Sequence, residues 1–436
     1  MYLSVCFRTT SLCGGRGPYK HYRCMCECAI HTQEKHNWFG EKKYRLATFF
    51  DLWWDEYCKH PRHFIQPEQY KAVQAIRSCR TAALGVDIYA CPQCGNTTEV
   101  YHNCKNRFCP TCSWSDTIRW AEKVKGNMLN LPHRHVVFTL PHQINFLINR
   151  NKFLLLNTLM QTSAETLKDW MVHKYDLQPG IISVLHTFGE QKESHFHTHM
   201  ILSWGGINKS RTVQQIKGIY VNYDYLKSKF RGIFEKRLCD FFDSGKLDHD
   251  FKNLIEFKRF LKRVNVKNWI IHFEDPMDTP SEVIRYIGRY SKRACLSEYK
   301  ITRMEGEIIA FRYKDYKNKD VSGLPIEKER ILEYSEFFPL LLQHVPLPFF
   351  RMVRYYGIYS NRGHLPKEYF NYDESTPLNW AAIHEAETGQ NPLVCPICKI
   401  NKIYIDSFVE TKTGTHKYIN PLLIHDSQLP FKDRAA

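Results

Sequence analysis

The sequence predicts a mixed α+β protein, because two kinds of apolar pattern alternate along the chain. Short apolar runs bounded by Pro or Gly, such as 133–141 and 180–189, are typical of strands. A longer stretch, 151–174, repeats its apolar residues at helical spacing. The runs 180–189 and 195–204 are separated only by a polar turn, which favours two strands joined by that turn. Together these patterns predict an α+β fold.

The individual elements follow from the same patterns. Helices are expected at 44–80, 151–174, 222–238, 252–263 and 281–296, the last with Ser281 as its N-cap. Strands are expected at 133–141, 180–189, 195–204 and 268–275, with a strand or hairpin at 307–318. The remainder is expected to be helical and to end in a small CPIC segment at 395–398.

The chain has 436 residues, which is enough for two or three domains with cores of their own. We expect an irregular extension at 1–43, a helical segment at 44–88, a zinc-binding module at 89–125, a main domain at 130–318 with an insertion at about 205–268, and a C-terminal region at 319–436.

Basic residues exceed acidic ones by 61 to 45, so the formal net charge is +16. This excess favours a polyanionic partner, and nucleic acid before a membrane surface. No apolar run reaches the ~18 residues of a spanning helix, and the first residues do not resemble a signal peptide. Many of the sixteen cysteines have metal-site spacing, which fits a reducing cytoplasm better than a disulfide scaffold.

Two CxxC pairs predict a structural zinc site. Cys91 and Cys94 are followed, after fourteen residues, by Cys109 and Cys112, and four thiolates at such spacing can surround one Zn²⁺. Cys104 could replace one of these ligands or pack beside them. A closed four-thiolate shell leaves no position for a substrate, so this zinc would be structural.

Two basic side chains lie between these pairs, and one more CxxC lies far from them. Lys105 and Arg107 are expected to point outward and to contact DNA, although the module could also be a scaffold alone. The later pair, Cys395 and Cys398, is half a metal site, which one of three histidines could complete. These candidates are His384, His416 and His425.

Three histidines alternate in the run at 195–204. Residues i and i+2 share one face of a strand, so His197 and His199 can bind one ion together. Glu190, across the turn, can reach the same point, and three such ligands leave coordination positions open. Two alternatives remain: an ordinary strand that binds no metal, and a pair formed by His195 and His197 around Phe196.

Two tyrosines lie four residues apart on the helix expected at 281–296. Tyr286 and Tyr290 therefore share one helical face, an arrangement that usually serves packing. Here four basic residues surround them, which suits contact with a phosphate. These are Arg285, Arg289, Lys292 and Arg293. A metal that polarises a phosphodiester and a tyrosine that attacks it together make a complete reaction.

Taken in order, these segments resemble the HUH-type two-tyrosine rolling-circle transposases of the IS91 type. The matching segments cover roughly residues 75–365 and are SCRTAALG, HVVFTLP, VLHTFGE, HFHTHMIL, VIRYIGRYSKRACLS, FRYKDYK and FRMVRYYGIYSNR. The resemblance implies a nuclease domain at 130–318 with a central antiparallel sheet flanked by helices, and a C-terminal helical region. It also implies His197 and His199 as the metal-binding pair, Glu190 as third ligand, and Tyr286 and Tyr290 as nucleophiles.

The same resemblance implies the reaction, the cofactors and the partners. Mg²⁺ or Mn²⁺ would assist tyrosine attack on single-stranded DNA, forming 5′-phosphotyrosine intermediates, and Zn²⁺ would be structural. The partners would be transposon ends and target DNA, in the bacterial cytoplasm with the nucleoid. This chain departs from the family pattern in having Thr198 between the two histidines, where a bulky apolar residue is usual, and Glu190 where Gln is frequent.

Two other functions fit the same residues. A replication-initiator or relaxase-type nickase would use the same chemistry, and the chain lacks the Walker-type phosphate loop of an attached helicase. A non-catalytic zinc-dependent DNA-binding regulator would give the histidines and tyrosines no joint role.

Overall fold

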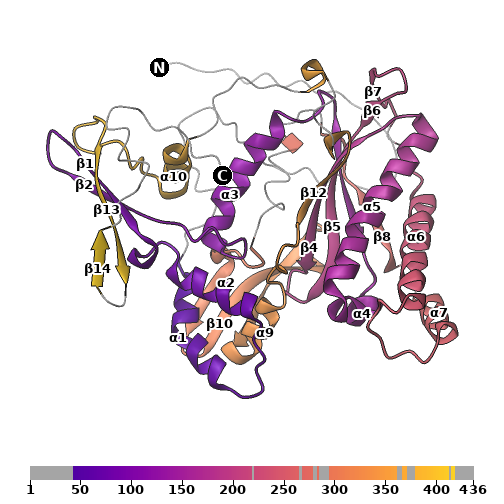
Figure 1. Ribbon diagram of the computed structural model, residues 1–436, viewed down its shortest axis with the longest axis horizontal. Helices are drawn as coiled ribbons and strands as arrows, with labels where there is room; N and C mark the ends of the chain where they lie inside the picture. The colour runs from indigo at the N-terminus through magenta and orange to yellow at the C-terminus, as the bar shows by residue number, and fades with distance from the viewer. Residues whose placement is uncertain are drawn as a thin grey trace. The chain divides into compact units, whose positions relative to one another are not determined.

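The computed structural model describes residues 43–218, 220–264, 268–277, 282–283, 294–360, 366–370, 379–411 and 414–417. Within these ranges the protein has a mixed α+β fold with a central antiparallel sheet, which confirms the predicted fold class (Figure 1). Tyr286, Tyr290 and their four basic neighbours lie outside the described residues. Among the helices that are described, none has both the length and the apolar character needed to cross a membrane.

Five antiparallel strands form the central sheet, in the order β12-β4-β5-β3-β8. They are β12 (Val353–Gly357), β4 (Gly180–Phe188), β5 (Ser194–Ser203), β3 (His133–Thr139) and β8 (Ile270–Phe273). The turn at 189–193 joins β4 and β5 into a hairpin, and the hairpin register pairs His186 with His197 and Val184 with His199. Because side chains alternate along a strand, each strand gives the two faces of this sheet different chemistry.

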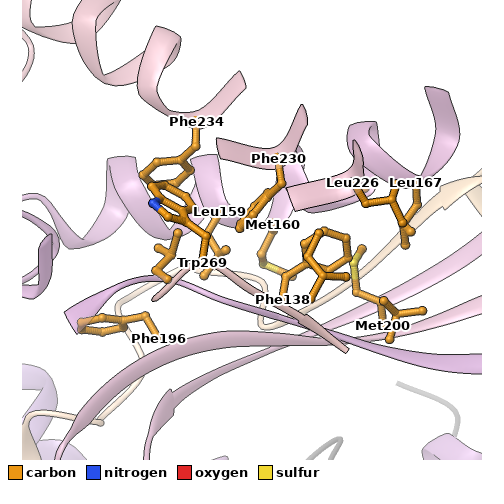
Figure 2. Close-up of a cluster of buried hydrophobic side chains, with 14 of the residues drawn as sticks. Phe138, Leu159, Met160, Leu167, Phe196, Met200, Leu226, Phe230, Phe234 and Trp269 are labelled. Atoms are coloured by element: carbon orange, nitrogen blue, oxygen red, sulfur yellow. The ribbon is translucent and has the colours of Figure 1, made fainter. Parts of the chain in front are cut away.

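One face of the sheet is apolar and packs against helices. It is covered by α4 (Asn145–Arg150), α5 (Lys152–Tyr175), α6 (Tyr223–Asp243) and α7 (Leu254–Arg263). Figure 2 shows Phe138, Phe196 and Met200 of the sheet meeting side chains of these helices, among them Leu159 and Phe230. Burying one such side chain contributes about 1.5–3 kcal/mol, so this layer is a main source of stability for the sheet.

The long helix α5 suits this buried position. It contains no Gly or Pro and ends at Asp176, whose left-handed φ of 53° closes its last turn. Three buried hydroxyl groups on it donate to the carbonyl oxygen four residues earlier, which satisfies them without water. These belong to Thr158, Ser163 and Thr166.

The opposite face carries the histidines at one end and an apolar cluster at the other. We name as the sheet-face cluster Trp120, Ala121, Val124, Met128, Leu129, Leu131, Ile182, Ile201, Ile207, Val283, Ile358 and Tyr359. Helix α3 (Pro110–Lys125) supplies its first residues and lies across the sheet from α5 (Figure 1). The Tyr359 hydroxyl accepts from the backbone N–H of Leu129 at 3.2 Å and bonds His133 Nε2 at 2.6 Å. Gly180 lies under this ring, where any Cβ would come within 2.5 Å of it.

A second core joins three helices to a separate sheet. The helices are α1 (Leu46–Lys59), α2 (Pro67–Ser78) and α9 (Tyr334–Leu342), and the sheet has the order β11-β10-β9, with β9 (Ile301–Glu305), β10 (Ile308–Lys319) and β11 (Pro325–Glu333). Phe50 and Phe338 stack here with ring centroids 5.1 Å apart. We name this the zinc-helix cluster, since Cys79, Cys109 and Cys112 are buried in it.

The C-terminal part of the chain returns to the N-terminal module. Strand β13 (Ile403–Thr411) pairs antiparallel with β1 (Val86–Ala90), and the whole sheet has the order β14-β13-β1-β2. Its other strands are β2 (Thr97–Tyr101) and β14 (Gly414–Lys417). The C-terminal strands β13 and β14 therefore belong to the same sheet as the N-terminal strands β1 and β2.

The insertion at 205–268 has the two helices that were expected, α6 and α7, preceded by the short strands β6 (Gly205–Ile207) and β7 (Val213–Gln215). The expectation that the remainder is helical was wrong. In 319–436 the described residues form β11, β12, β13 and β14 as well as α9 and α10 (Trp380–Thr388). The physical reason is that short apolar runs fit either structure, and each of these strands pairs with a strand that lies before it in the chain.

Candidate nuclease site and zinc sites

Three histidines meet on the polar end of the central sheet. His186 lies on β4, and His197 and His199 lie on β5; one ring nitrogen of each comes within 4.8 Å of the others. The Nε2 atoms of His197 and His199 are 3.1 Å apart, and the rings of His186 and His199 have centroids 4.5 Å apart. The hairpin produces this cluster, because His186 and His197 are cross-strand partners and His199 follows His197 on the same face.

Burial keeps two of these imidazoles, those of His197 and His199, neutral. The pKa values of His197 and His199 lie well below the usual value, first because burial disfavours the charged ring and then because neighbouring imidazoles repel a second proton. A neutral imidazole is the form that binds a metal ion. His197 and His199 therefore have the protonation state of metal ligands at neutral pH.

A fourth histidine, His135, contacts the ring of His199. His135 on β3 lies with its Nε2 2.8 Å from Nδ1 of His199, and the two rings stack with centroids 5.0 Å apart. Burial lowers the pKa of His135 to about 4, so it too is neutral. If His199 binds a metal through Nε2, its proton must lie on Nδ1, where His135 Nε2 can accept it. The strand at 133–141 was predicted, but nothing in its sequence marked His135 as a partner of His199.

The structure does not bring Glu190, the expected third ligand, to the histidines. The Glu190 carboxylate accepts from Lys300 Nζ at 3.0 Å and from the backbone N–H of Lys314 at 3.3 Å. Burial acts to raise the pKa of this carboxyl group, but the charge of Lys300 outweighs it and the pKa is lowered. A register shift between His186 and Phe188 and the following turn direct Glu190 toward β10. His186 occupies the expected place instead, and pairing the predicted strands across their turn would have found it.

The three histidines in the run at 195–204 are not equivalent. All three share one face of β5, but the cluster is formed by His197 and His199 with His186, while His195 only approaches His197, at a centroid distance of 5.0 Å. Phe196 between the alternative pair points into the apolar core on the opposite face.

The first of two cysteine clusters lies in the zinc-helix cluster. It consists of Cys79, Cys104, Cys109 and Cys112, whose sulfur atoms all lie within 4.8 Å of one another. Cys112 Sγ is 3.5 Å from Cys79 Sγ and 3.6 Å from Cys104 Sγ. Cys109 is the N-cap of α3 and Cys112 lies in its first turn, where the helix dipole favours thiolates.

The second cluster unites two parts of the sequence that lie far apart. Cys91 and Cys94 meet Cys395 and Cys398, again with all sulfur atoms within 4.8 Å, and Cys94 Sγ lies 3.6 Å from Cys395 Sγ. The expected single site of Cys91, Cys94, Cys109 and Cys112 was therefore wrong, because each CxxC pair finds its partners elsewhere. Cys91 and Cys94 complete the site of Cys395 and Cys398, for which three histidines had been candidates; of these, His384 contacts Thr388.

Comparison with known proteins bears on both kinds of site. A family model described as "Transposase zinc-binding domain" matches residues 49–140, and one described as "Putative transposase" matches residues 180–366. The chain is 30% identical to "Putative transposase y4qJ" of Sinorhizobium fredii over 370 residues, which is 80% of this chain and 92% of that protein. The chain belongs to the IS91-type transposases.

Another relative of this transposase is the "Transposase for insertion sequence element IS801" of Pseudomonas savastanoi pv. phaseolicola, 24% identical over 355 residues, or 77% of this chain and 83% of that one. No solved structure matches the chain. Family membership implies DNA as a partner, and the zinc-binding domain together with the cysteine clusters supports structural Zn²⁺. The "Putative transposase" match includes His186, His197 and His199 and also the positions of Tyr286 and Tyr290.

The two basic residues between the CxxC pairs of the transposase's zinc-binding module are exposed. Lys105 is exposed and has a left-handed φ of 53°, directly after the zinc-site residue Cys104. Arg107 is exposed too, and its Nη1 donates to the Phe350 carbonyl oxygen at 3.1 Å. A DNA contact by either residue stays a prediction.

Proposed function

We propose that this transposase cleaves and rejoins single-stranded DNA ends by metal-assisted tyrosine attack, as in rolling-circle transposition. The observation that carries the proposal is the cluster of His186, His197 and His199, three imidazoles on one face of the central sheet, within a family match that also includes the positions of Tyr286 and Tyr290.

The three histidines fit a divalent cation. Three imidazole nitrogens leave several coordination positions open for phosphate oxygens. Imidazole is a better ligand for Mn²⁺ than for Mg²⁺, which prefers oxygen, so the donor set favours manganese. When bound, such an ion would draw charge from the scissile phosphate. His135 would hold the ring of His199 with Nε2 toward the ion.

The described residues on the two sides of the tyrosine positions are buried in two different clusters. Val283, three residues before Tyr286, is buried in the sheet-face cluster with Ile182. Leu296, after the segment, is buried in the zinc-helix cluster, against which Phe188 packs. On β4 the histidine cluster lies between Ile182 and Phe188, which are about 20 Å apart along the strand. The described residues on either side of the tyrosine positions therefore belong to clusters that Ile182 and Phe188 contact on β4, the strand that carries His186.

The chemistry then assigns each residue a role. The hydroxyl oxygen of Tyr286 or Tyr290 loses its proton and attacks the phosphorus, and the bond from phosphorus to the 3′ oxygen breaks. The products are a 5′-phosphotyrosine and a 3′ oxygen that takes up a proton and becomes a free 3′-hydroxyl. The second tyrosine would cleave another strand or end, and each 3′-hydroxyl can later reverse the step on a new partner. The phosphotyrosine conserves the bond energy, so no nucleotide cofactor is needed.

Basic and aromatic side chains would hold the strand. Arg285, Arg289, Lys292 and Arg293 flank the tyrosines in sequence, and Lys105 and Arg107 lie exposed on the zinc-binding module. Their contacts would be to phosphates, with bases stacking on aromatic rings, which suits single-stranded DNA.

A replication-initiator or relaxase-type nickase would share this chemistry, but both relatives described above are named as transposases. A non-catalytic regulator would leave the histidine cluster without a role. Covalent capture separates these classes: the protein with Mn²⁺ and a labelled single-stranded end should give an adduct that survives denaturation. Mass spectrometry should find the DNA on Tyr286 or Tyr290, and only the double change to Phe should remove all adduct. An adduct on Tyr299, Tyr313 or Tyr316 would overturn the assignment.

A further inference from the structure

We propose that Cys91, Cys94, Cys395 and Cys398 hold a second structural zinc ion, which fastens the C-terminal segment to the N-terminal module. The matched zinc-binding domain ends at residue 140 and so includes only the first two of these cysteines. The inference does not depend on the proposed function, since it concerns metal content and the packing of 379–411.

The two CxxC segments have the same backbone structure. In the first, the Cys91 N–H donates to the Asn96 carbonyl at 2.9 Å, and the Gly95 N–H donates back to the Cys91 carbonyl at 2.9 Å. In the second, the Cys395 N–H donates to the Ile400 carbonyl at 2.9 Å.

The match extends to the residue after each second cysteine. The Lys399 N–H donates to the Cys395 carbonyl at 3.0 Å, as Gly95 does to Cys91. Both residues have left-handed φ angles, 71° at Gly95 and 59° at Lys399. A lysine adopts this conformation at some cost, so the shape of the second turn is imposed by something other than its own sequence. Two equal turns that face each other are how zinc ribbons present four thiolates.

The sulfur geometry fits one tetrahedral ion. A Zn–S distance of ~2.3 Å places the sulfur atoms of a tetrahedral site roughly 3.8 Å apart. Cys94 Sγ and Cys395 Sγ are 3.6 Å apart, and all four sulfur atoms lie within 4.8 Å of one another. A disulfide would require ~2.05 Å, well below the separation of Cys94 and Cys395.

Surrounding contacts hold the two turns together. The Lys402 side chain is buried, and its Nζ donates to Asn96 Oδ1 at 2.8 Å and to the Thr98 hydroxyl, so a residue of the second segment bonds two of the first. Its positive charge also offsets part of the negative charge of a four-thiolate zinc site. Beyond it, β13 pairs with β1 in register from Ala90 opposite Ile403.

The two cysteine clusters differ in exposure. In the first, Cys79, Cys109 and Cys112 are buried within a hydrophobic core and only Cys104 is partly exposed. In the second, Cys94 is exposed and Cys398 is partly exposed. A chelator would therefore reach the second ion first, and its loss would free the C-terminal segment while the first site stays closed.

The test is the metal content of the full-length protein. We expect two thiolate-bound zinc ions per chain, in addition to any ion at the histidine cluster, falling to one in the double variant Cys395→Ser, Cys398→Ser. The matched control is Cys239→Ser on α6, since Cys239 belongs to neither cluster and its loss should leave both ions. Hydrogen exchange should then show faster exchange in 379–411 of the double variant, with the central sheet unchanged.

A second measurement removes any dependence on that variant folding. Wild-type protein stripped of zinc and titrated with Co²⁺ should bind two equivalents with thiolate-to-cobalt absorption. One thiolate-bound ion per chain in the wild type, or two thiolate-bound ions retained in the folded double variant, would overturn the proposal. Failure of DNA cleavage with two zinc ions bound would count against the proposed function alone.

Discussion

The histidine cluster and the two cysteine clusters are built in opposite ways. His186, His197 and His199 come from a single hairpin, so one turn and one register produce the cluster. The cysteine sites join residues that are distant in the chain, from Cys79 to Cys112 and from Cys94 to Cys395. The hairpin offers a site for chemistry on a sheet that other contacts stabilise. The cysteine sites close long loops and therefore belong to the stability of the fold.

The largest effect should come from removing a histidine ligand. His199→Ala should reduce DNA cleavage by at least about 100-fold, because the metal's polarisation of the phosphate is lost. Binding of single-stranded DNA should change little, since phosphate contacts dominate affinity. Adduct formation and a binding titration on the same preparation measure the two effects.

His195→Ala is the matched control, because His195 lies on the same strand face outside the cluster. Its cleavage should be much closer to wild type. If His195 proves essential and His199 dispensable, the pair around Phe196 is the correct one.

Loss of a cysteine ligand should affect stability before chemistry. Cys109→Ser should lower the free energy of unfolding by several kcal/mol, at least about 3, because it opens a buried four-thiolate site. Cys395→Ser should cost less, because its site is partly exposed and holds a terminal segment. Thermal unfolding with zinc present measures both, and equal losses would remove the distinction between the two sites.

The third ligand can be tested by comparing two neighbours in the same hairpin. His186→Ala should lower Mn²⁺ affinity by about 10–100-fold, because one of three nitrogen ligands is lost. Glu190→Gln should leave the affinity near wild type, and loss of its partly exposed ion pair with Lys300 should cost less than about 1 kcal/mol of stability. Calorimetric titration with Mn²⁺ decides, and the reverse order of effects would restore Glu190 as the ligand.

The smallest effect should be on the pH dependence of stability. His135 has its pKa lowered to about 4 by burial, and burial also lowers those of His197 and His199. The unfolded chain binds protons at these rings below about pH 6.5, whereas the folded chain resists them, so stability should fall as pH drops below that value. The decrease in melting temperature from pH 7 to pH 5 should be smaller in His135→Gln than in the wild type.

Several strands and helices of this protein could be predicted from local sequence patterns. The strands around 133–141, 180–189 and 195–204 and the helix α5 lie where the sequence predicted them, because period-two and helical apolar spacing depend on neighbouring residues alone. The grouping of the cysteines into zinc sites could not be predicted from local patterns. Cys91 and Cys94 were assigned to the nearest CxxC pair, whereas the structure brings them to Cys395 and Cys398.

By itself, then, the sequence determined the alternation that puts His197 and His199 on one face of β5, and the family motifs around them. Tertiary structure decided which residues join them. The register of the β4–β5 hairpin placed His186, and not Glu190, beside His197 and His199. The pairing of β13 with β1 brought Cys395 and Cys398 to Cys91 and Cys94. The physical reason is that side-chain direction follows from local backbone geometry, whereas proximity across the chain depends on which strands pair and which cores exclude water.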